Sequence, residues 1–450
     1  MMAQPADLLV TNVTLASPST GWLPEPGWLA VRNGRVAAVG RAGDQEPAAL
    51  RVIDGLSGLL LPGLRNAHTH GSEILARGCA DGLSLGDWLA TVWPKLDSLK
   101  PAEAALAALF GALQSIRCGV TAVVDHMRRT PMTDEVAEAV AAAYLRSGIR
   151  SLLAVMVRDR VDAGKRQVGA RHLGMPETPS RQLERIETLA GRLSGGRISF
   201  GVGPSASIRC TDEMLQGVAE LGTRAALPVH IHVAETQGEV ASDRQAFGMT
   251  AIARLEKFGL MRPSTACAHC VWLDEEDLDI FADSGASIVH NPVSNLRLGS
   301  GVANMQAFNA RGIPIAIGTD GAASNDGVDV WDALKFAALL PRRDGLVEAR
   351  VNHPQMLDQV TLTGREALGP SSDLLPLAIG APADFCLYPE AEMPFARGEA
   401  FTAALVLNGS RRPSHVVIGG DVVLDNGVFP DIDEAEVTVG IRQLTKEVIS

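Results

Sequence analysis

The sequence lacks the features that mark membrane proteins and secreted, disulfide-rich proteins. No stretch reaches about 18 uninterrupted apolar residues, the usual length of a membrane span. The opening segment, MMAQPADLLV, has no basic region followed by a long apolar core, so we expect no secretory signal and a cytoplasmic location. Six cysteines are scattered through 450 residues without a disulfide-like framework, which favours reduced thiols.

Positive charge is also scarce. The 40 Lys and Arg residues are outnumbered by 52 Asp and Glu residues, which gives a net charge of -12. This balance argues against a nucleic acid or an anionic membrane as the main partner. Hydrophobic residues make up 46% and charged residues 20%, with no low-complexity tract, as in a globular protein that acts on a small molecule. The length predicts several domains, or one large barrel with an attachment.

Both ends of the chain are rich in short β-strand patterns. The N-terminal segment contains DLLVTNVTLAS, GWLAVRNGRVAAVG and RVIDGLSGLLL, and Asn33-Gly34 between two β-rich runs is a strong hairpin signal. The C-terminal segment contains ADFCLYP, TAALVLN and SHVVIGGDVVLDNG, which also read as strands. We therefore expect one small β-sandwich domain built from residues 1–60 and 380–450.

The middle of the chain, residues 61–379, alternates apolar strand candidates with helical segments such as PAEAALAALFGALQSIR. The expected strands lie at residues 60–68, 119–126, 148–157, 197–205, 227–235, 265–272, 286–292 and 313–321. Apolar strands separated by crossover helices predict a parallel sheet, and eight is the number that closes a (β/α)8 barrel. The predicted fold class is α/β: a (β/α)8 TIM barrel with a small β-sandwich domain built from both termini.

Unusual polar residues fall at the predicted C-terminal ends of these strands, where such a barrel carries its chemistry. They are His68, His70, Asp125, His126, His232, Glu235, His269, His290 and Asp320. His68 and His70 share one side of an extended segment because side chains alternate with period two. A third imidazole and a carboxylate would complete a set of ligands suited to zinc or ferrous iron. A lone HxH can be a surface accident, but a set on several strand ends is not typical of core histidines.

The segment VHIHVAE, residues 229–235, leaves a choice open. His230 and His232 share a face of the strand about 7 Å apart, so spacing alone does not select the third imidazole. Glu235 is placed to accept a proton from an activated water and to deliver it to a leaving group. The alternative is that Glu235 caps the following helix.

Five segments closely resemble the amidohydrolase superfamily: PGLRNAHTH, HIHVAET, AHCVWLDEEDL, VHNPVSNLRLGSG and IGTDGAASN. The resemblance covers nearly the whole chain, and the nearest branch is similar to the cytosine, guanine, S-adenosylhomocysteine/methylthioadenosine and triazine deaminases. It implies that the metal ligands are His68, His70, His232 and Asp320. It also implies that Glu235 is the proton shuttle, that His269 hydrogen-bonds the substrate or the nucleophile, and that Asp320 helps to orient the water.

Three further patterns bear on the site. Binuclear members of the superfamily carry a carboxylated lysine on the fourth strand, and RISFGVGPS has none, so we expect one divalent ion, zinc or alternatively iron. Gly71 stands where close relatives often carry a bulkier apolar residue, which leaves the floor of the pocket open to question. Cys267 and Cys270 are spaced like a zinc-binding pair, but without a second pair we interpret them as buried thiols. The HxE and PCxxC motifs of the small cytidine deaminases are absent, so that fold is not expected.

Two long loops are candidates for the substrate pocket. Residues 71–100 carry Trp88 and Trp93, either of which can stack on a flat ring or pack on the surface. Residues 158–181 contain six basic and three acidic residues. An arginine such as Arg158 can clamp a carboxylate there, and a solvated surface or a subunit contact is the alternative. Further candidate substrate contacts are His126, Asn291 and Asn295.

The predicted function is hydrolytic release of ammonia from an amino-substituted N-heteroaromatic ring of the purine, pyrimidine, pterin or s-triazine type. One alternative is a related hydrolase that displaces chloride or an alkylamine from a triazine, or opens a cyclic amide. The other is a non-catalytic barrel that acts in assembly. The expected partner is a small heterocyclic substrate, with no nucleic acid and no membrane, and we expect a homodimer or homotetramer.

Overall fold

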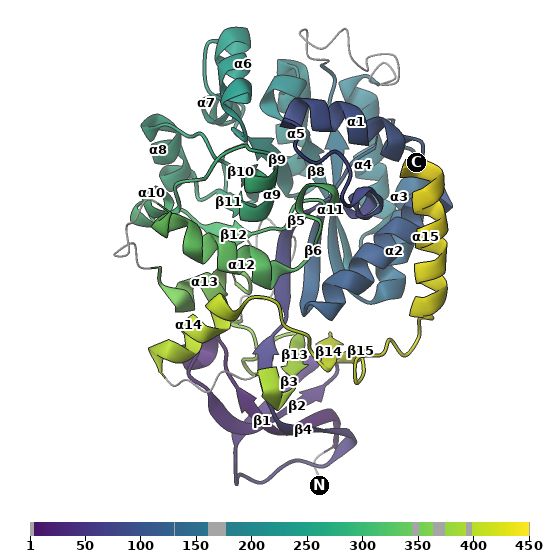
Figure 1. Cartoon of the computed structure of the whole chain (residues 1–450), viewed down its shortest axis with the longest axis vertical. Coiled ribbons are helices and arrows are strands. Elements are labelled where there is room, and N and C mark those ends of the chain that lie inside the picture. Colours follow the sequence, from purple (N-terminus) through teal and green to yellow (C-terminus); the bar gives the residue numbers. More distant parts are fainter. Residues whose placement is uncertain are drawn as a thin grey trace.

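The computed structural model describes residues 4–129, 131–160, 177–343, 351–362, 374–392 and 398–449. Two sheets organise this part of the chain. Figure 1 shows a small sheet, which contains the N-terminal strands, at one end of the molecule and a helix-covered barrel above it. No helix within these ranges is long and apolar enough to cross a membrane.

The barrel is an eight-stranded sheet whose parallel strands follow one another in chain order. The strands are β5 (Leu64–Thr69), β6 (Val120–Met127), β7 (Arg150–Val157), β8 (Ile198–Pro204), β9 (Val229–Val233), β10 (Thr265–His269), β11 (Ser287–His290) and β12 (Ile315–Ile317). The two edges meet where the Asp320 amide donates to the His68 carbonyl at 2.9 Å, and where the Asn66 side chain bonds to Thr319. The predicted (β/α)8 barrel is confirmed.

Helices cover the outside of the barrel. They are α2 (Pro101–Arg117), α3 (Asp134–Ser147), α4 (Pro179–Leu193), α5 (Asp212–Arg224), α6 (Gln237–Phe247), α7 (Ala251–Lys257), α8 (Glu275–Ser284), α9 (Pro292–Arg297), α10 (Met305–Ala310), α11 (Ala322–Asn325), α12 (Val330–Leu339) and α13 (His353–Gln359). In α5, for example, Met214, Val218 and Leu221 recur at helical spacing and are buried. The main hydrophobic core lies between such faces and the barrel strands.

The small sheet has the order β15-β14-β13-β4-β1-β2-β3. Its strands are β1 (Ala6–Leu15), β2 (Glu25–Arg32), β3 (Arg35–Arg41), β4 (Ala49–Pro62), β13 (Phe385–Tyr388), β14 (His415–Ile418) and β15 (Asp421–Leu424). Asn33 and Gly34 join β2 to β3 with φ values of 51° and 73°, as a two-residue hairpin turn requires, so the predicted hairpin is confirmed. Backbone hydrogen bonds join residues 34–36 to residues 380–383. The sheet residues from both ends of the chain share one apolar core.

Two predicted details are wrong. TAALVLN, read as a strand, lies in the helix α14 (Glu399–Asn408), which packs against α12 and α13. Residues 71–100, read as a loop, contain the short 3-10 helix η2 (Gly71–Ala76) and the helix α1 (Leu85–Asp97). The chain ends in α15 (Glu434–Ile449), which runs along α2 on the barrel (Figure 1). Strands of the segment 380–450 therefore join the small sheet, whereas its helices contact the barrel.

Candidate metal centre and active site

Four buried side chains converge at the C-terminal end of the barrel. His68 lies in β5, and His70 is the first residue after that strand. His232 lies in β9, and Asp320 follows β12. Asp320 Oδ1 lies 3.2 Å from His68 Nε2 and 3.4 Å from His70 Nε2, and His232 Nε2 lies 3.3 Å from His70 Nε2. Ligands about 2.0–2.1 Å from a tetrahedral zinc ion stand about 3.3 Å from one another. The three separations therefore allow neighbouring ligand atoms to contact one zinc ion.

The hydrogen bonds of the histidines orient their lone pairs toward the same point. His70 Nδ1 donates to the His126 carbonyl at 2.7 Å, and His232 Nδ1 donates to the Ser205 carbonyl at 2.6 Å. Since each Nδ1 carries the proton, each Nε2 is free to bind a metal. His68 Nε2 is buried and makes no hydrogen bond to any residue that the structure describes. Burial lowers the pKa of His68 to about 4 and that of His232 well below its ordinary value, so both rings are neutral at neutral pH, as metal binding requires.

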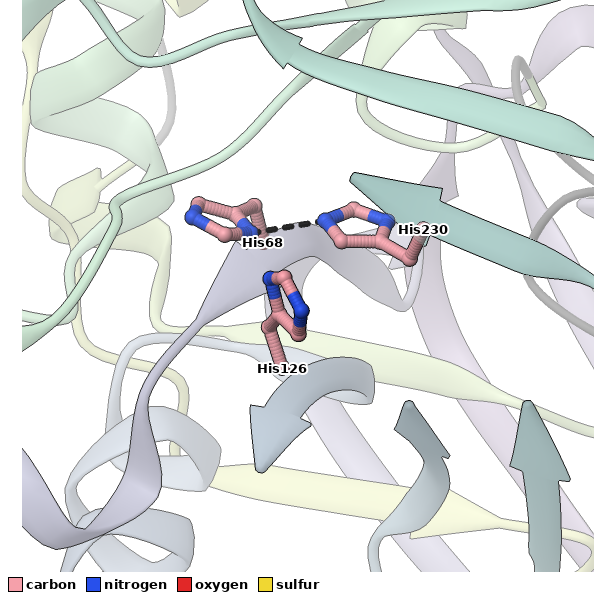
Figure 2. Close-up of side chains that lie close together, drawn as sticks. All are labelled: His68, His126 and His230. Atoms are coloured by element: carbon pink, nitrogen blue, oxygen red, sulfur yellow. Dashed lines mark hydrogen bonds between the residues drawn. The ribbon is translucent and has the colours of Figure 1, made fainter. Parts of the chain in front are cut away.

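A second pair of histidines lies deeper, behind the ring of His68. Figure 2 shows His230 from β9 pointing at His68, and His126 from β6 beside them. His230 Nε2 lies 2.7 Å from His68 Nδ1, and the His126 ring stacks on His232 with centroids 4.5 Å apart. His68, His126 and His230 also have spacing that can hold a metal. With its Nε2 facing Asp320, His68 uses its Nδ1 for His230, which places His230 behind the ligands.

Asp320 is fixed by three donors. Its Oδ2 accepts hydrogen bonds from Ser294 at 2.6 Å and Ser324 at 3.0 Å, and the Gly321 amide donates to Oδ1 at 2.8 Å. Burial raises the pKa of Asp320, but the nearby histidines outweigh this effect and hold it well below its usual range. The carboxylate is therefore ionised and aimed at His68 and His70. The sequence interpretation missed both serines, although NPVSN and GAASN contain them.

Glu235 and His269 form a second buried pair beside the ligands. Glu235 Oε1 accepts a hydrogen bond from Ser300 at 3.0 Å, and Oε2 lies 3.8 Å from His269 Nε2. Burial raises the pKa of Glu235 to about 7. The idea that Glu235 caps the following helix is wrong, because Thr236 is the N-cap of α6 and accepts from the Glu239 amide. A carboxyl with this pKa can both accept and release a proton near neutrality.

His269 is held by Asn295 and by its acidic neighbours. Its Nδ1 donates to Asn295 Oδ1 at 2.8 Å, which leaves Nε2 facing Glu235. Burial lowers the pKa of His269, but the charges of Glu235 and Asp320 outweigh burial and leave it raised. Asn295, predicted as a substrate contact, thus contacts His269.

Gly71 is explained by its contacts with Asp125 and Tyr144. Its amide donates to Asp125 Oδ1 at 3.0 Å, and the Tyr144 hydroxyl donates to Asp125 Oδ2 at 2.9 Å. A Cβ at residue 71 would lie 2.6 Å from the Tyr144 hydroxyl oxygen and 2.7 Å from Asp125 Oδ2. The wall next to His70 is therefore closed by a polar network that leaves no space for a side chain.

The other predicted substrate contacts differ in their surroundings. His126 Nε2 donates to the Gly203 carbonyl at 3.2 Å. Asn291 is fully buried, and its amide has no hydrogen-bond partner among the described residues. The ring of Trp93 is covered by the Arg128 guanidinium, 4.3 Å from its centroid, and Arg158 lies 5.7 Å away. Residues 161–176, most of the predicted polar loop, lie outside the described residues.

A cavity of about 1010 Å³ opens beside Glu235. Thr236 and Ser300 line it, together with Arg160, Arg209 and Trp272. Ser300, which lines the cavity, is also the donor to Glu235. This space is large enough for a heterocyclic ligand with a substituent.

Glu73 is a buried acid that the sequence interpretation overlooked. It lies on η2, three residues after His70, and burial raises the pKa of its carboxyl to about 7. The Trp93 indole and the Arg128 guanidinium lie beside this carboxyl and oppose the effect of burial on its pKa. The cysteines, by contrast, behave as expected: Cys267 and Cys270 are buried and free, and the metal-binding clusters found among the described residues contain no cysteine.

Comparison with known proteins identifies the family and the fold. The family model described as "Amidohydrolase family" matches residues 59–423. The chain is similar to a 5'-deoxyadenosine deaminase of Methanosarcina barkeri, with 29% identity over 451 residues and 99% of each protein covered. It is also similar to a 5-methylthioadenosine/S-adenosylhomocysteine deaminase of Moorella thermoacetica, with 32% identity over 451 residues and 98% of each protein covered.

Two solved structures are similar over the whole chain. One is an adenosine deaminase from Xanthomonas campestris with bound zinc, at 26% identity and a TM-score of 0.88, with 99% of each chain covered. The other is an atrazine chlorohydrolase from Arthrobacter aurescens TC1 complexed with zinc, at 24% identity and a TM-score of 0.88. It covers 97% of this chain and 100% of its own, and at this identity it shows the fold alone.

Proposed function

This chain belongs to the amidohydrolase family, and we propose that it is a metal-dependent deaminase that hydrolyses an amino group from an N-heteroaromatic ring. The observation that carries the proposal is the set of three imidazoles and a carboxylate spaced to contact one ion, beside a buried glutamate with a pKa of about 7. Relatives named as adenosine-type deaminases support release of ammonia over other outcomes.

The ligand set supports one divalent ion held by His68, His70, His232 and Asp320. Nitrogen and oxygen donors at this spacing suit zinc, and zinc is bound in the similar adenosine deaminase structure, while iron is the alternative. Such an ion supplies Lewis-acid activation of the hydrolytic water. Neutral histidine rings and an ionised Asp320 are the protonation states that this role needs.

Glu235 and His269 have separate roles in the reaction. Glu235 accepts a proton from the attacking water and passes it to the ring nitrogen next to the amino-bearing carbon. His269, oriented by Asn295, hydrogen-bonds the substrate and polarises it. Water adds to the ring carbon, and Glu235 then takes the remaining proton of the added hydroxyl and delivers it to the amino group. The carbon–nitrogen bond breaks, ammonia leaves and the carbonyl forms. The products are ammonia and an oxo-substituted ring.

The decisive experiment measures ammonia release by the zinc-loaded protein from adenosine-type nucleosides, amino-purines, amino-pyrimidines, pterins and amino-triazines. We expect turnover of at least one class and, for Glu235→Gln, a fall in kcat of about 10²- to 10⁴-fold with metal content unchanged. Chloride or alkylamine release from triazines without ammonia release would favour the related-hydrolase alternative. Full metal occupancy without turnover of any compound would favour a non-catalytic barrel.

The oligomeric state and the cellular location are two further parts of the proposal. We propose a cytoplasmic homodimer or homotetramer. Light scattering coupled to gel filtration measures the oligomeric state directly, and a monomer at micromolar concentration would contradict it.

A further inference from the structure

Arg254 is a buried charge that lies outside the metal centre. It belongs to α7, and it is only 1% exposed. Burying a guanidinium is costly unless its donors are bonded and its charge is paired. All three nitrogens of Arg254 donate hydrogen bonds, and the guanidinium carbon lies 3.5 Å from the centroid of the Phe247 ring. The side chain is therefore fixed along its whole length.

The acceptors of Arg254 lie in the segment that joins β8 to α5, the β8 loop (residues 205–211), and at the first residue of α5. Nη1 donates to the Ser207 carbonyl at 2.6 Å and to the Ser207 hydroxyl at 3.2 Å. Nη2 donates to the Cys210 carbonyl at 3.0 Å and to Asp212 at 2.7 Å. Because α7 follows β9 in the chain, Arg254 ties the β8 loop to a helix that follows the neighbouring strand.

The β8 loop also orients one of the proposed metal ligands. The Ser205 carbonyl accepts the hydrogen bond from His232 Nδ1 at 2.6 Å, and Ala206 forms a parallel β-bridge with His232. Such an acceptor fixes both the tautomer and the direction of a ligand ring. The Ser205 amide is anchored on β7 through the Val157 carbonyl at 2.9 Å, while Arg254 holds the loop two residues further on. A displacement at that second anchor would move the acceptor of His232.

The same loop forms part of the large cavity. Ile208 and Arg209 line it, and Arg209 pairs with Glu239 of α6 at 3.3 Å. Arg254 itself is not among the residues that line the cavity, and none of its hydrogen bonds goes to a proposed ligand. Any influence of Arg254 on the site must therefore pass through the β8 loop.

We infer that Arg254 is a positioning residue of the metal centre. By clamping the β8 loop from α7, it holds the Ser205 carbonyl at the place where His232 needs its acceptor in order to bind the metal. The inference rests on the proposed function, because it takes His232 as a ligand. It predicts that losing the clamp weakens metal binding by more than a general loss of stability does.

The test measures the zinc Kd of the full chain by competition with a chromophoric chelator, at a temperature well below Tm. Arg254→Met keeps a long side chain but removes every donor, and we expect it to raise the zinc Kd about 10-fold. Arg254→Lys keeps the charge without the planar fork that reaches several acceptors at once, so it should raise the Kd by less. The visible absorption of the cobalt(II)-loaded protein reports the geometry around the ion, and its band should shift in Arg254→Met.

The chain offers a closely matched control in Arg411, which precedes β14. Arg411 is also 1% exposed, donates to the backbone carbonyls of Glu392 and Ala404, and lies over the Trp331 ring at 5.4 Å from its centroid. Arg411→Met therefore removes the same kind of buried clamp from a different part of the molecule. It should lower Tm, as Arg254→Met does, but leave the zinc Kd and the cobalt(II) spectrum unchanged.

The outcomes separate this inference from the proposed function. An unchanged zinc Kd in Arg254→Met, or an equal rise in Arg254→Met and Arg411→Met, would overturn the inference and leave the proposed function standing. If Arg254→Met does not fold, Arg254→Lys decides: a raised Kd supports the clamp, and an unchanged Kd overturns it. If zinc binds but no compound releases ammonia, the proposed reaction fails while the comparison of Kd values still decides the role of Arg254. A wild-type protein that binds no divalent ion would overturn both.

Discussion

The serines behind Asp320 give the sharpest test of the metal centre. Ser294 and Ser324 both donate to Asp320 Oδ2, at 2.6 Å and 3.0 Å, while Oδ1 faces His68 and His70. Replacing either serine by alanine removes one donor without touching a ligand atom. A hydrogen bond to a buried charge contributes about 1.5–3 kcal/mol, but part of this is present with and without metal and cancels. Loss of such an orienting contact lowers metal affinity about 10- to 100-fold.

We therefore expect Ser294→Ala to raise the Kd for zinc by about 10- to 100-fold, and Ser324→Ala to raise it less. Ser324 also donates to the Gly321 carbonyl, and its bond to Asp320 is the longer one. Because both serines share one oxygen, the double variant should lose less than the product of the single effects. Competition against a chromophoric zinc chelator at fixed pH measures all three constants.

The matched control is Ser151→Ala on β7. Ser151 is buried, and within the described ranges its hydroxyl has no hydrogen-bond partner, so its removal should leave zinc affinity unchanged. An unchanged zinc Kd in both Asp320-contacting variants would refute the reasoning, because it would mean that the ligand position does not depend on these donors. A fall in Tm of the metal-free protein without a change in Kd would lead to the same conclusion.

Three further predictions follow from the same contacts. Asn295→Ala should lower kcat/KM about tenfold or more with metal retained, and Asn295→Asp, which keeps an acceptor for His269, should be impaired less. Gly71→Ala should lower the free energy of unfolding by about 1–3 kcal/mol in denaturant titrations, because its methyl group would lie 2.6 Å from the Tyr144 hydroxyl oxygen, and an unchanged value would contradict the close packing. In the metal-free protein, burial raises the pKa of Glu235 from 4.5 to about 7, so the folded state binds more protons between these values. Stability should then fall as pH rises through this window, and Glu235→Gln should flatten the slope in unfolding titrations.

The periodic spacing of residues along the sequence was enough to predict much of the fold and part of the site. Apolar strands separated by helices indicate the barrel, and period two puts His68 and His70 on one side of β5. The segment TAALVLN shows the limit of this reasoning, since a short apolar run is compatible with either a strand or a buried helix. In the structure, Phe401 and Leu405 are buried one helical turn apart in α14. A helix places both side chains on one buried face, and this packing favours the helix over the strand.

Neighbours from distant segments account for what the sequence could not predict. His230 and His232 share a face of β9, and only the fold shows that His230 contacts the back of His68 while His232 reaches His70. Glu73 looks like an ordinary acid in GSEILA. Its burial depends on Gly321, which leaves space for the carboxyl and lies beside it only after the barrel closes. Both cases require the relative position of strand ends, which one-dimensional spacing does not encode.

The backbone at the strand ends gives an independent reason to regard this place as functional. Ala234, His269, Cys270 and Asp320 all have positive φ values, between 46° and 75°, in a region that favours glycine. Such conformations cost about 1–3 kcal/mol each and persist only where the surrounding structure enforces them. Here they lie at the C-terminal ends of β9, β10 and β12, in the segments that carry Glu235, His269 and Asp320. Glycine at residues 269 and 320 would relieve the strain, but it would also remove the imidazole and the carboxylate. The backbone preference for glycine is therefore overridden by the need for these side chains in the site.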